Sequence, residues 1–219
     1  RKMDPRVYSR CLTALGFSLV VLFSGCAGAP SGPTNIARGD YGPAMQYLSA
    51  VIRHDMAKHN VQGLSIALID DQKVVWAEGF GYADVANKVP ATADTIYRIG
   101  SISKVFTATE IMRLAERNQV DLDEPVTTYV PEFAIRNRFA GSRPITLRAL
   151  LAHHSGLPSE VLKGMWVDHP VSLADYVTAL REESLASPPQ TLYKYSNIDF
   201  SLLGKVIENV EHQEFSRAM

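Results

Sequence analysis

Two short motifs that stand far apart in the chain constrain its fold more than any other feature. The first is Ser101-Ile-Ser-Lys104 and the second is Tyr195-Ser-Asn197, and each pattern occurs once in the 219 residues. A serine hydroxyl becomes a useful nucleophile only when a neighbouring group takes its proton. An amine, a phenol and an amide beside it could hold, move or release that proton. If both motifs belong to one site, the chain must fold so that these two segments meet.

The first motif reads as the start of a helix. Gly100 allows a sharp turn into it, and apolar residues recur at helical spacing as far as about Glu116. The expected apolar stripe is Val105, Ala108, Ile111, Met112 and Ala115. Because residues three apart share a helix face, Lys104 lies beside Ser101. A lysine on an apolar face loses solvent, which favours the neutral, basic form of its amine.

Both motifs also have an ordinary structural interpretation. Serine is a common N-cap and lysine is common on exposed helical turns, so Ser101 and Lys104 alone say little. Serine and asparagine favour turns, and a tyrosine such as Tyr195 often anchors a loop to a core. The order and wide spacing of the motifs favour the catalytic interpretation, because a serine acyltransferase site built between two parts of a fold requires them.

Five ordered segments between about Val61 and Phe215 carry a resemblance to a known family. They are Tyr97-Arg-Ile-Gly-Ser-Ile-Ser-Lys104, Leu122-Asp-Glu-Pro-Val126, Ile145-Thr-Leu-Arg-Ala-Leu-Leu-Ala-His-His-Ser-Gly-Leu-Pro158, Tyr195-Ser-Asn197 and Leu202-Leu-Gly-Lys-Val-Ile-Glu208. Together they resemble the serine β-lactamase-related family, which includes class C β-lactamases, D-alanyl-D-alanine carboxypeptidases and related esterases. The match of five segments in order is far more specific than either short motif alone.

The resemblance implies a role for each residue of the two motifs. Ser101 would be the acylated nucleophile and Lys104 its proton partner. Tyr195 would act with Lys104 as the acid/base, above all when the acyl group is released. Asn197 would hydrogen-bond the amide or side-chain carbonyl of the substrate. The Y-x-N form resembles class C enzymes rather than class A enzymes, which carry S-D-N and a separate glutamate base.

Two adjacent histidines, His153 and His154, invite a general-base interpretation, since histidine is the usual proton carrier near neutral pH. In the family, however, the His-x-Ser-Gly-Leu segment is structural and caps a turn. The resemblance therefore implies that neither histidine is catalytic.

A third family motif, a Lys- or His-x-Gly triplet on a strand beside the site, has no match after Asn197. In family members that strand supplies one of the two donors of the oxyanion hole. Removal of one such donor costs about 10²–10³ in rate in other serine hydrolases. We therefore expect an incomplete domain that lacks C-terminal strands, and little or no turnover by the chain as it stands.

The first residues predict an export signal. Four basic residues precede an apolar run over about 12–23, which is too short to span a bilayer but fits a secretory signal. The run ends in Leu22-Phe-Ser-Gly-Cys26, which resembles a bacterial lipoprotein cleavage site with Cys26 as the lipidated residue. The alternative is ordinary signal cleavage at Ala27-Gly-Ala29, which would leave a freely soluble protein. Either way we expect a protein of the cell envelope or periplasm.

Composition narrows the remaining classes. The two cysteines, Cys11 and Cys26, both lie in the leader, so the body has no cysteine pair for a disulfide or a metal site. A net charge of −1 gives no electrostatic case for nucleic acid. No phosphate-binding loop or metal-ligand cluster is evident, so we expect no cofactor and no metal. We expect a monomer that acts on a small molecule or peptide and contacts membrane only through its leader or lipid.

Hydrophobic spacing outlines the expected elements. We predict a helix over 44–59, strands over 64–69 and 74–77 around a turn at 70–73, a helix over 199–210, and N-caps at Thr146 and Ser172, the latter in a capping-box-like pair with Asp175. The first strand is apolar on both faces, so we expect helices on both sides of its sheet.

The expected fold class is α+β, with a helix-flanked antiparallel sheet plus a mostly helical subdomain, as in β-lactamases and transpeptidases. The expected organisation is a signal peptide over 1–26, a flexible tether over 27–43 and a partial hydrolase domain over 44–219. Two functions remain open. One is a hydrolase for β-lactams, D-Ala-D-Ala peptides or small esters, and the other is a non-catalytic relative that binds penicillin or peptidoglycan.

Overall fold

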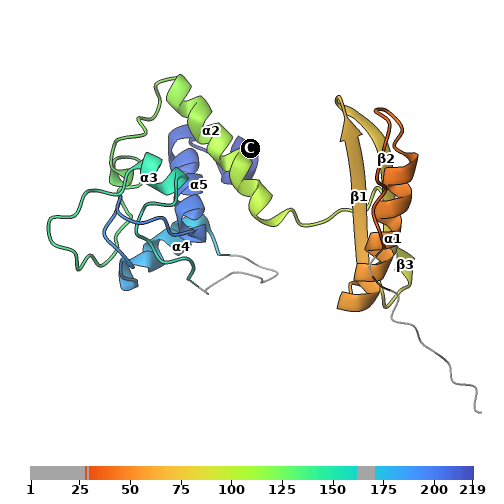
Figure 1. Ribbon diagram of the computed structural model, residues 1–219. Helices are drawn as coiled ribbons and strands as arrows, with labels where there is room; N and C mark the ends of the chain where they lie inside the picture. Colours follow the sequence, from red (N-terminus) through yellow and green to blue (C-terminus); the bar gives the residue numbers. More distant parts are fainter. Residues whose placement is uncertain (1–27, 29, 162–170) are drawn as a thin grey trace, which may run out of the picture. The chain divides into compact units, whose positions relative to one another are not determined.

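The structure is a computed structural model that describes residue 28 and residues 30–161 and 171–219. The chain divides into two compact units, with the boundary between Tyr97 and Arg98 (Figure 1). The predicted signal peptide, with Cys26, lies outside the described residues. The predicted tether and domain limits stay predictions, although residues 30–41 contain no helix or strand.

The first unit pairs one helix with a small antiparallel sheet. Its elements are α1 (Gly42–His59), β1 (Gly63–Asp70), β2 (Lys73–Asp84) and β3 (Val89–Pro90), and the strand order is β1-β2-β3. The hairpin register places Asp70 opposite Lys73, so the tight turn that the sequence predicts is present. The second strand is much longer than predicted, because it continues past Ala77 as far as Asp84.

Helix α1 lies along the sheet, as Figure 1 shows. The guanidinium of Arg53 stands 5.0 Å from the ring centre of Phe80 on β2, and Trp76 meets the same ring edge-on. Among the described residues of this unit α1 is the single helix. The expectation of helices on both sheet faces is therefore not met within the unit, where Ile69 and Val74 at the hairpin end are largely exposed.

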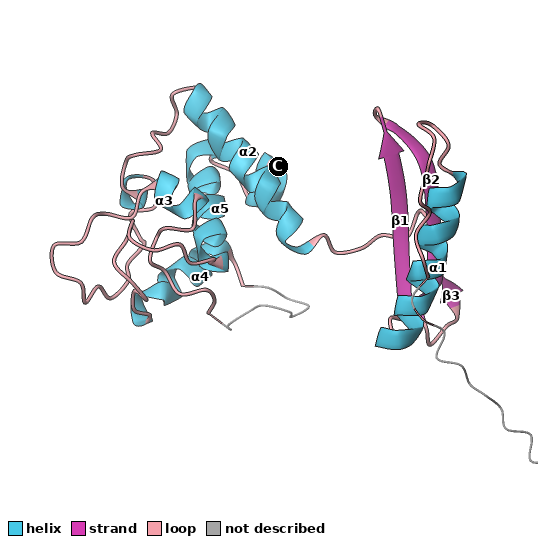
Figure 2. Ribbon diagram, in the orientation of Figure 1, coloured by secondary structure: helices cyan, strands magenta, loops and turns pink. Residues whose placement is uncertain are grey.

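The second unit is built from helices joined by loops, whereas the strands belong to the first unit (Figure 2). Its elements are η1 (Gly100–Ile102), α2 (Ser103–Glu116), η2 (Val126–Thr128), α3 (Leu147–Leu151), α4 (Leu173–Ala179), η3 (Leu180–Glu182), α5 (Asn197–Glu211) and α6 (Phe215–Ala218). Helix α5 contacts α2, α3, α4 and α6 and is the centre of the unit. Sheet and helical subdomain together match the α+β class that the sequence predicts.

The core of the second unit gathers side chains from well-separated segments. Fully buried members include Ile111, Leu114, Leu147, Leu150, Leu157, Leu180, Ile198, Leu202, Leu203 and Ile207. Burial of apolar area at about 25 cal/mol per Å² is the main force that holds such helices together. The core therefore fixes α2 and the start of α5, which carry Lys104 and Asn197 of the two motifs.

The predicted helix stripe on α2 is partly wrong. Ile111 is buried, but Val105 is 64% exposed and Met112 is 50% exposed. The buried positions of α2 are instead Thr107, Glu110, Ile111 and Leu114. Glu110 is accommodated because its carboxylate accepts a hydrogen bond from Arg113 at 2.5 Å. The buried face of α2 is thus rotated from its most apolar face.

The predicted helix caps are confirmed. The Thr146 hydroxyl accepts a hydrogen bond from the Ala149 amide at 3.2 Å, and the Ser172 hydroxyl accepts one from the Asp175 amide at 3.1 Å. Gly100 has φ +53, so the sharp turn that the sequence predicts before Ser101 is present. Among the described residues no helix is both long enough and apolar enough to cross a membrane.

Candidate active site

The two motifs meet within the second unit. Ser101 lies in the 3-10 turn η1 directly before α2, and its Oγ is 2.7 Å from the phenol oxygen of Tyr195. The Nζ of Lys104, one turn along, donates to the same Oγ at 3.2 Å. The arrangement of serine, amine and phenol that the sequence predicts is therefore present. The catalytic roles of the three side chains stay predictions.

Lys104 is held by both motifs. Its Nζ donates to Oδ1 of Asn197 at 2.6 Å and stands 4.9 Å from the ring centre of Tyr195 and 5.6 Å from that of Phe200. Aromatic faces attract a cation through their quadrupole, and the amide oxygen satisfies one of its donors. The amine is thereby kept beside Ser101 while its stem is half-buried.

The second motif is positioned by the first turn of α5. Ser196 is the N-cap of this helix. Its hydroxyl accepts a hydrogen bond from the Asp199 backbone N–H at 3.3 Å and donates one to the Pro158 carbonyl at 2.6 Å. The backbone N–H of Asn197 donates to the Ser159 carbonyl at 2.8 Å. The loop after Leu157 and the helix start therefore fix one another. An N-cap serine between tyrosine and asparagine explains the middle residue of the Y-x-N motif.

The electrostatic setting of Tyr195 suits a group that exchanges protons. Lys104 first, and then Ser101, lower the pKa of the Tyr195 phenol below its ordinary value, because both favour the phenolate. Partial burial and the charge of Glu160 oppose this lowering. A lowered pKa increases the fraction of Tyr195 that is phenolate near neutral pH, and the phenolate is the form that can accept the proton of Ser101.

A buried polar network lies behind the phenol and was not predicted from the sequence. Asp199 is fully buried, and its carboxyl contacts the Ser155 hydroxyl at 2.5 Å and Nδ1 of His153 at 2.9 Å. Burial raises the pKa of Asp199 to about 8, despite the opposing effect of the Ser155 hydrogen bond. The carboxyl is therefore mostly protonated at neutral pH.

His153 is the partner that fits a protonated carboxyl. Burial first, then Lys104 and His154, lower the pKa of His153, so its ring is neutral at neutral pH. The Ser196 amide also points at its Nδ1, at 3.2 Å. Because the protonated Asp199 carboxyl and the Ser196 backbone N–H can both donate, Nδ1 of His153 is the acceptor and its ring proton is on Nε2. The centre of the imidazole ring is 4.5 Å from the centre of the Tyr195 ring, so the two rings pack against one another.

Neither histidine hydrogen-bonds Ser101. Nδ1 of His153 contacts Asp199, and Nδ1 of His154 contacts the Ala152 carbonyl at 2.8 Å. The sequence offered one signal for the hidden network, which is a carboxyl two residues after the Y-x-N motif. Helical spacing could place Asp199 in the first turn of a helix, but only packing shows that this side is buried.

Glu160 is a further residue of the site that the sequence reasoning left without a role. Its Oε1 accepts a hydrogen bond from Nδ2 of Asn197 at 2.6 Å. The Asn197 side chain therefore bridges the Lys104 ammonium and the Glu160 carboxylate. No local pattern marks this residue, because its importance depends on contact with a helix far along the chain.

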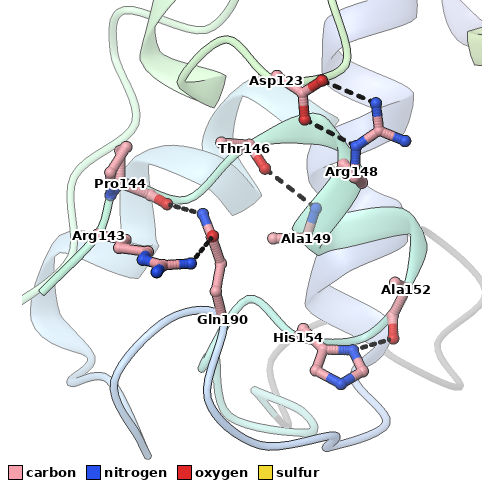
Figure 3. A pocket seen from close by; sticks show the side chains of 9 residues that line it. All are labelled: Asp123, Arg143, Pro144, Thr146, Arg148, Ala149, Ala152, His154 and Gln190. Carbon is pink, nitrogen blue, oxygen red and sulfur yellow. Dashed lines mark hydrogen bonds and ion pairs between the residues drawn. The ribbon is translucent and has the colours of Figure 1, made fainter.

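One cavity of this unit lies away from the two motifs. It has a volume of about 430 Å³ and is lined by Asp123, Arg143, Pro144, Thr146, Arg148, Ala149, Ala152, His154 and Gln190 (Figure 3). Its polar groups satisfy one another, since Arg148 donates twice to Asp123 and Gln190 bridges Arg143 and the Pro144 carbonyl. A smaller cavity of about 270 Å³ is lined in part by Lys104 and Asn197, so it is next to the two motifs. We therefore place the candidate site by its side chains rather than by cavity size.

The described residues contain no group of three or more His, Cys, Asp or Glu side chains placed to hold a metal ion.

Comparison with known proteins gives a consistent result. The family model named Beta-lactamase matches residues 48–219. Protein flp of Staphylococcus aureus strain MRSA252 is 34% identical over 175 residues, which are 80% of this chain and 35% of flp. The octameric penicillin-binding protein homologue from Pyrococcus abyssi is 34% identical with a TM-score of 0.68, and the match covers 79% of this chain and 40% of that one.

A third relative is an enzyme by name. The D-amino acid amidase from Ochrobactrum anthropi SV3 is 30% identical with a TM-score of 0.62, and the match covers 75% of this chain and 44% of the amidase. The chain thus spans less than half the length of each of these three relatives. The match over residues 48–219 covers most of the sequence, and the chain belongs to the beta-lactamase family.

Proposed function

We propose that this protein is a serine hydrolase of the cell envelope that forms an acyl ester on Ser101. Its candidate substrates are β-lactams, D-Ala-D-Ala peptides and small esters. The observation that carries the proposal is the placement of Ser101 Oγ within hydrogen-bonding distance of both Tyr195 OH and Lys104 Nζ. Membership of the beta-lactamase family supports it, and so does the amidase among the relatives.

The proposed reaction follows from these contacts. Ser101 Oγ forms a bond to the substrate carbonyl carbon while its proton passes to the Tyr195–Lys104 pair. The bond from that carbon to the leaving nitrogen or oxygen then breaks, and the same pair returns the proton to the leaving group. Water then bonds to the ester carbon and gives a proton to the pair, the bond from that carbon to Ser101 Oγ breaks, and the pair returns the proton to Oγ as the acid leaves. General acid–base assistance of this kind contributes about 10²–10⁴ in rate.

The experiment is intact-mass measurement of the purified protein after exposure to a fluorophosphonate and, separately, to benzylpenicillin. We expect one adduct, located on Ser101 by peptide mapping and absent from Ser101→Ala. Tyr195→Phe should slow penicillin acylation by at least about 100-fold, because the proton relay loses its phenol. Tyr193→Phe is the matched control, since it removes the hydroxyl of an exposed tyrosine that lacks a hydrogen-bond partner among the described residues.

A non-catalytic binder is the second candidate, and the penicillin-binding protein homologue among the relatives favours it. The two candidates differ in the lifetime of the penicillin adduct. Release within the time of the assay supports a hydrolase, whereas an adduct that persists supports a binder or sensor. Equal labelling of Ser101→Ala and the unaltered protein would exclude both.

We also propose that the protein is exported and held in the envelope through lipid on Cys26. The apolar leader and the Leu22–Cys26 segment support this proposal. Cell fractionation after expression in a bacterium tests this proposal. The unaltered protein should stay with membranes, and Cys26→Ser should move to the soluble fraction if lipid is the anchor.

A further inference from the structure

The Asn197 side chain is held at both ends, and this fixes its orientation. Its Oδ1 accepts from the Lys104 ammonium and its Nδ2 donates to the Glu160 carboxylate, each at 2.6 Å. An ammonium can only donate and a carboxylate can only accept, so the reverse orientation of the amide would lose both hydrogen bonds. The amide nitrogen of Asn197 is therefore directed toward a negative charge.

This orientation changes what a substrate meets beside Ser101. The amide of Asn197 was expected to bind a carbonyl oxygen of the substrate. Here one of its N–H groups is occupied by Glu160. A carbonyl oxygen directed at that N–H would face the carboxylate, which offers it no donor, so only the second N–H of Asn197 remains for a carbonyl.

The charge of Glu160 is available to a ligand. The side chain is exposed, and among the described residues it takes part in no ion pair with a lysine, arginine or histidine. Its charge reaches the reacting groups, because it contributes to the pKa of the Tyr195 phenol in the direction opposite to Lys104. A cationic group on a bound acyl chain would give the Glu160 carboxylate a partner of opposite charge in addition to its hydrogen bond from Asn197.

We propose that Glu160 is a specificity-determining residue that binds an ammonium group on the acyl part of the substrate. This inference rests on the proposed function. The substrate class is then an ester or amide of an amino acid whose amine is free, and the site discriminates against the same compound when that amine is acylated. The ammonium forms a charge-assisted hydrogen bond, which is about twice as strong as a neutral one.

The bonds that form and break in the acyl transfer do not include this contact. Ser101 Oγ bonds to the carbonyl carbon, the alcohol or amine leaves with the proton that the serine gave up, and the substrate ammonium keeps its proton throughout. Glu160 acts on the choice of acyl group, and Ser101, Lys104 and Tyr195 act on the bond that breaks.

The test compares two substrates that differ only at the amine, phenylalanine methyl ester and N-acetyl-phenylalanine methyl ester, each in both enantiomers. The measured quantity is the second-order rate constant for acylation of Ser101, followed by intact mass. We expect the protein to favour the free amine by at least about 10-fold in one enantiomer, the size of effect that one well-placed polar contact gives. Glu160→Gln should remove most of that preference, and Glu160→Lys should reverse it.

Two controls keep the result interpretable. Glu132→Gln removes the same charge from an exposed glutamate outside the site and should keep the preference. The fluorophosphonate carries no amine, so its rate on Ser101 in Glu160→Gln measures any effect of the substitution on Asn197 and Tyr195 that is separate from recognition of the amine. A normal fluorophosphonate rate also shows that the variant is folded.

The failure of this inference can be told from failure of the proposed function. If the fluorophosphonate labels Ser101 but the two esters react alike, or Glu160→Gln slows both esters equally, Glu160 does not select an ammonium group and the inference is wrong. If no reagent labels Ser101, the proposed function and the inference fall together.

Discussion

Asp199 is the residue whose chemistry departs most from its ordinary behaviour. An isolated buried carboxylate is costly, and a carboxyl in such a place remains neutral instead. The protonated form can donate to Nδ1 of His153 while its other oxygen accepts from the Ser155 hydroxyl. The network therefore needs a neutral acid, and it lies directly behind the ring of Tyr195.

This leads to a prediction about the pH dependence of stability. The pKa of Asp199 rises from 3.8 to about 8 on folding. Between these values the unfolded chain has released a proton that the folded protein keeps. The stability that this group contributes is therefore fully present below about pH 4 and is lost as the pH rises toward 8. Asparagine resembles the protonated acid, so Asp199→Asn should match the unaltered protein near pH 4.5.

Above pH 8 we expect Asp199→Asn to be more stable than the unaltered protein by about 1–3 kcal/mol, the cost of a poorly satisfied buried polar group. Urea unfolding at pH 4.5 and pH 8.5 measures both differences. Asp123→Asn is the control, because Arg148 lowers the pKa of that exposed aspartate and no gain at high pH is expected. The same stability difference at both pH values would show that Asp199 ionises normally.

At the scale of the element, short helices depend on their caps. Helix α3 has only five residues, and its first turn is closed by the hydroxyl of Thr146. The loop that follows α3 carries His153 and Ser155, which contact Asp199 on α5. A helix this short has little stability of its own, so the cap and the core together must hold it.

We predict that Thr146→Ala lowers the free energy of unfolding by about 0.5–2 kcal/mol, because one amide of the first turn loses its acceptor. Thr146→Ser keeps the hydroxyl and should recover most of the loss. Chemical denaturation of the three proteins measures this. If serine and alanine destabilise equally, the lost methyl group and not the cap is responsible.

At the scale of the molecule, the second unit has one core that joins all its longer helices. Leu203 of α5 is fully buried in it, whereas Leu192 in the loop before the second motif is 61% exposed. The site residues take their positions from this core, since Ser101 precedes α2 and Asn197 begins α5. Damage to the core should therefore reach the site without any change in its residues.

We expect Leu203→Ala to cost about 2–5 kcal/mol through lost burial and the cavity that remains. Leu192→Ala should change stability by less than about 0.5 kcal/mol. Thermal unfolding followed by circular dichroism measures stability, and fluorophosphonate labelling of Ser101 at rising temperature measures the site. Labelling in Leu203→Ala should end at a lower temperature, together with the fold. Loss of labelling well below the unfolding transition would instead mean that the core mutation distorts the site directly.

The amino-acid sequence alone determined the features that depend on neighbours along the chain. Helical spacing placed Lys104 beside Ser101, and local hydroxyls predicted the caps at Thr146 and Ser172. The pairing of the two distant motifs also followed from the sequence, but through the resemblance to a known family. It could not come from periodicity, which describes one element at a time.

Tertiary structure decided which faces and which distant partners matter. Periodicity shows that residues share a helix face, yet only packing buried Glu110 and left Met112 exposed on α2. The same holds for Asp199, whose raised pKa is a consequence of burial, and for Glu160, whose contact with Asn197 joins a loop to a helix. Burial and long-range contact arise from the whole fold, so no local pattern encodes them.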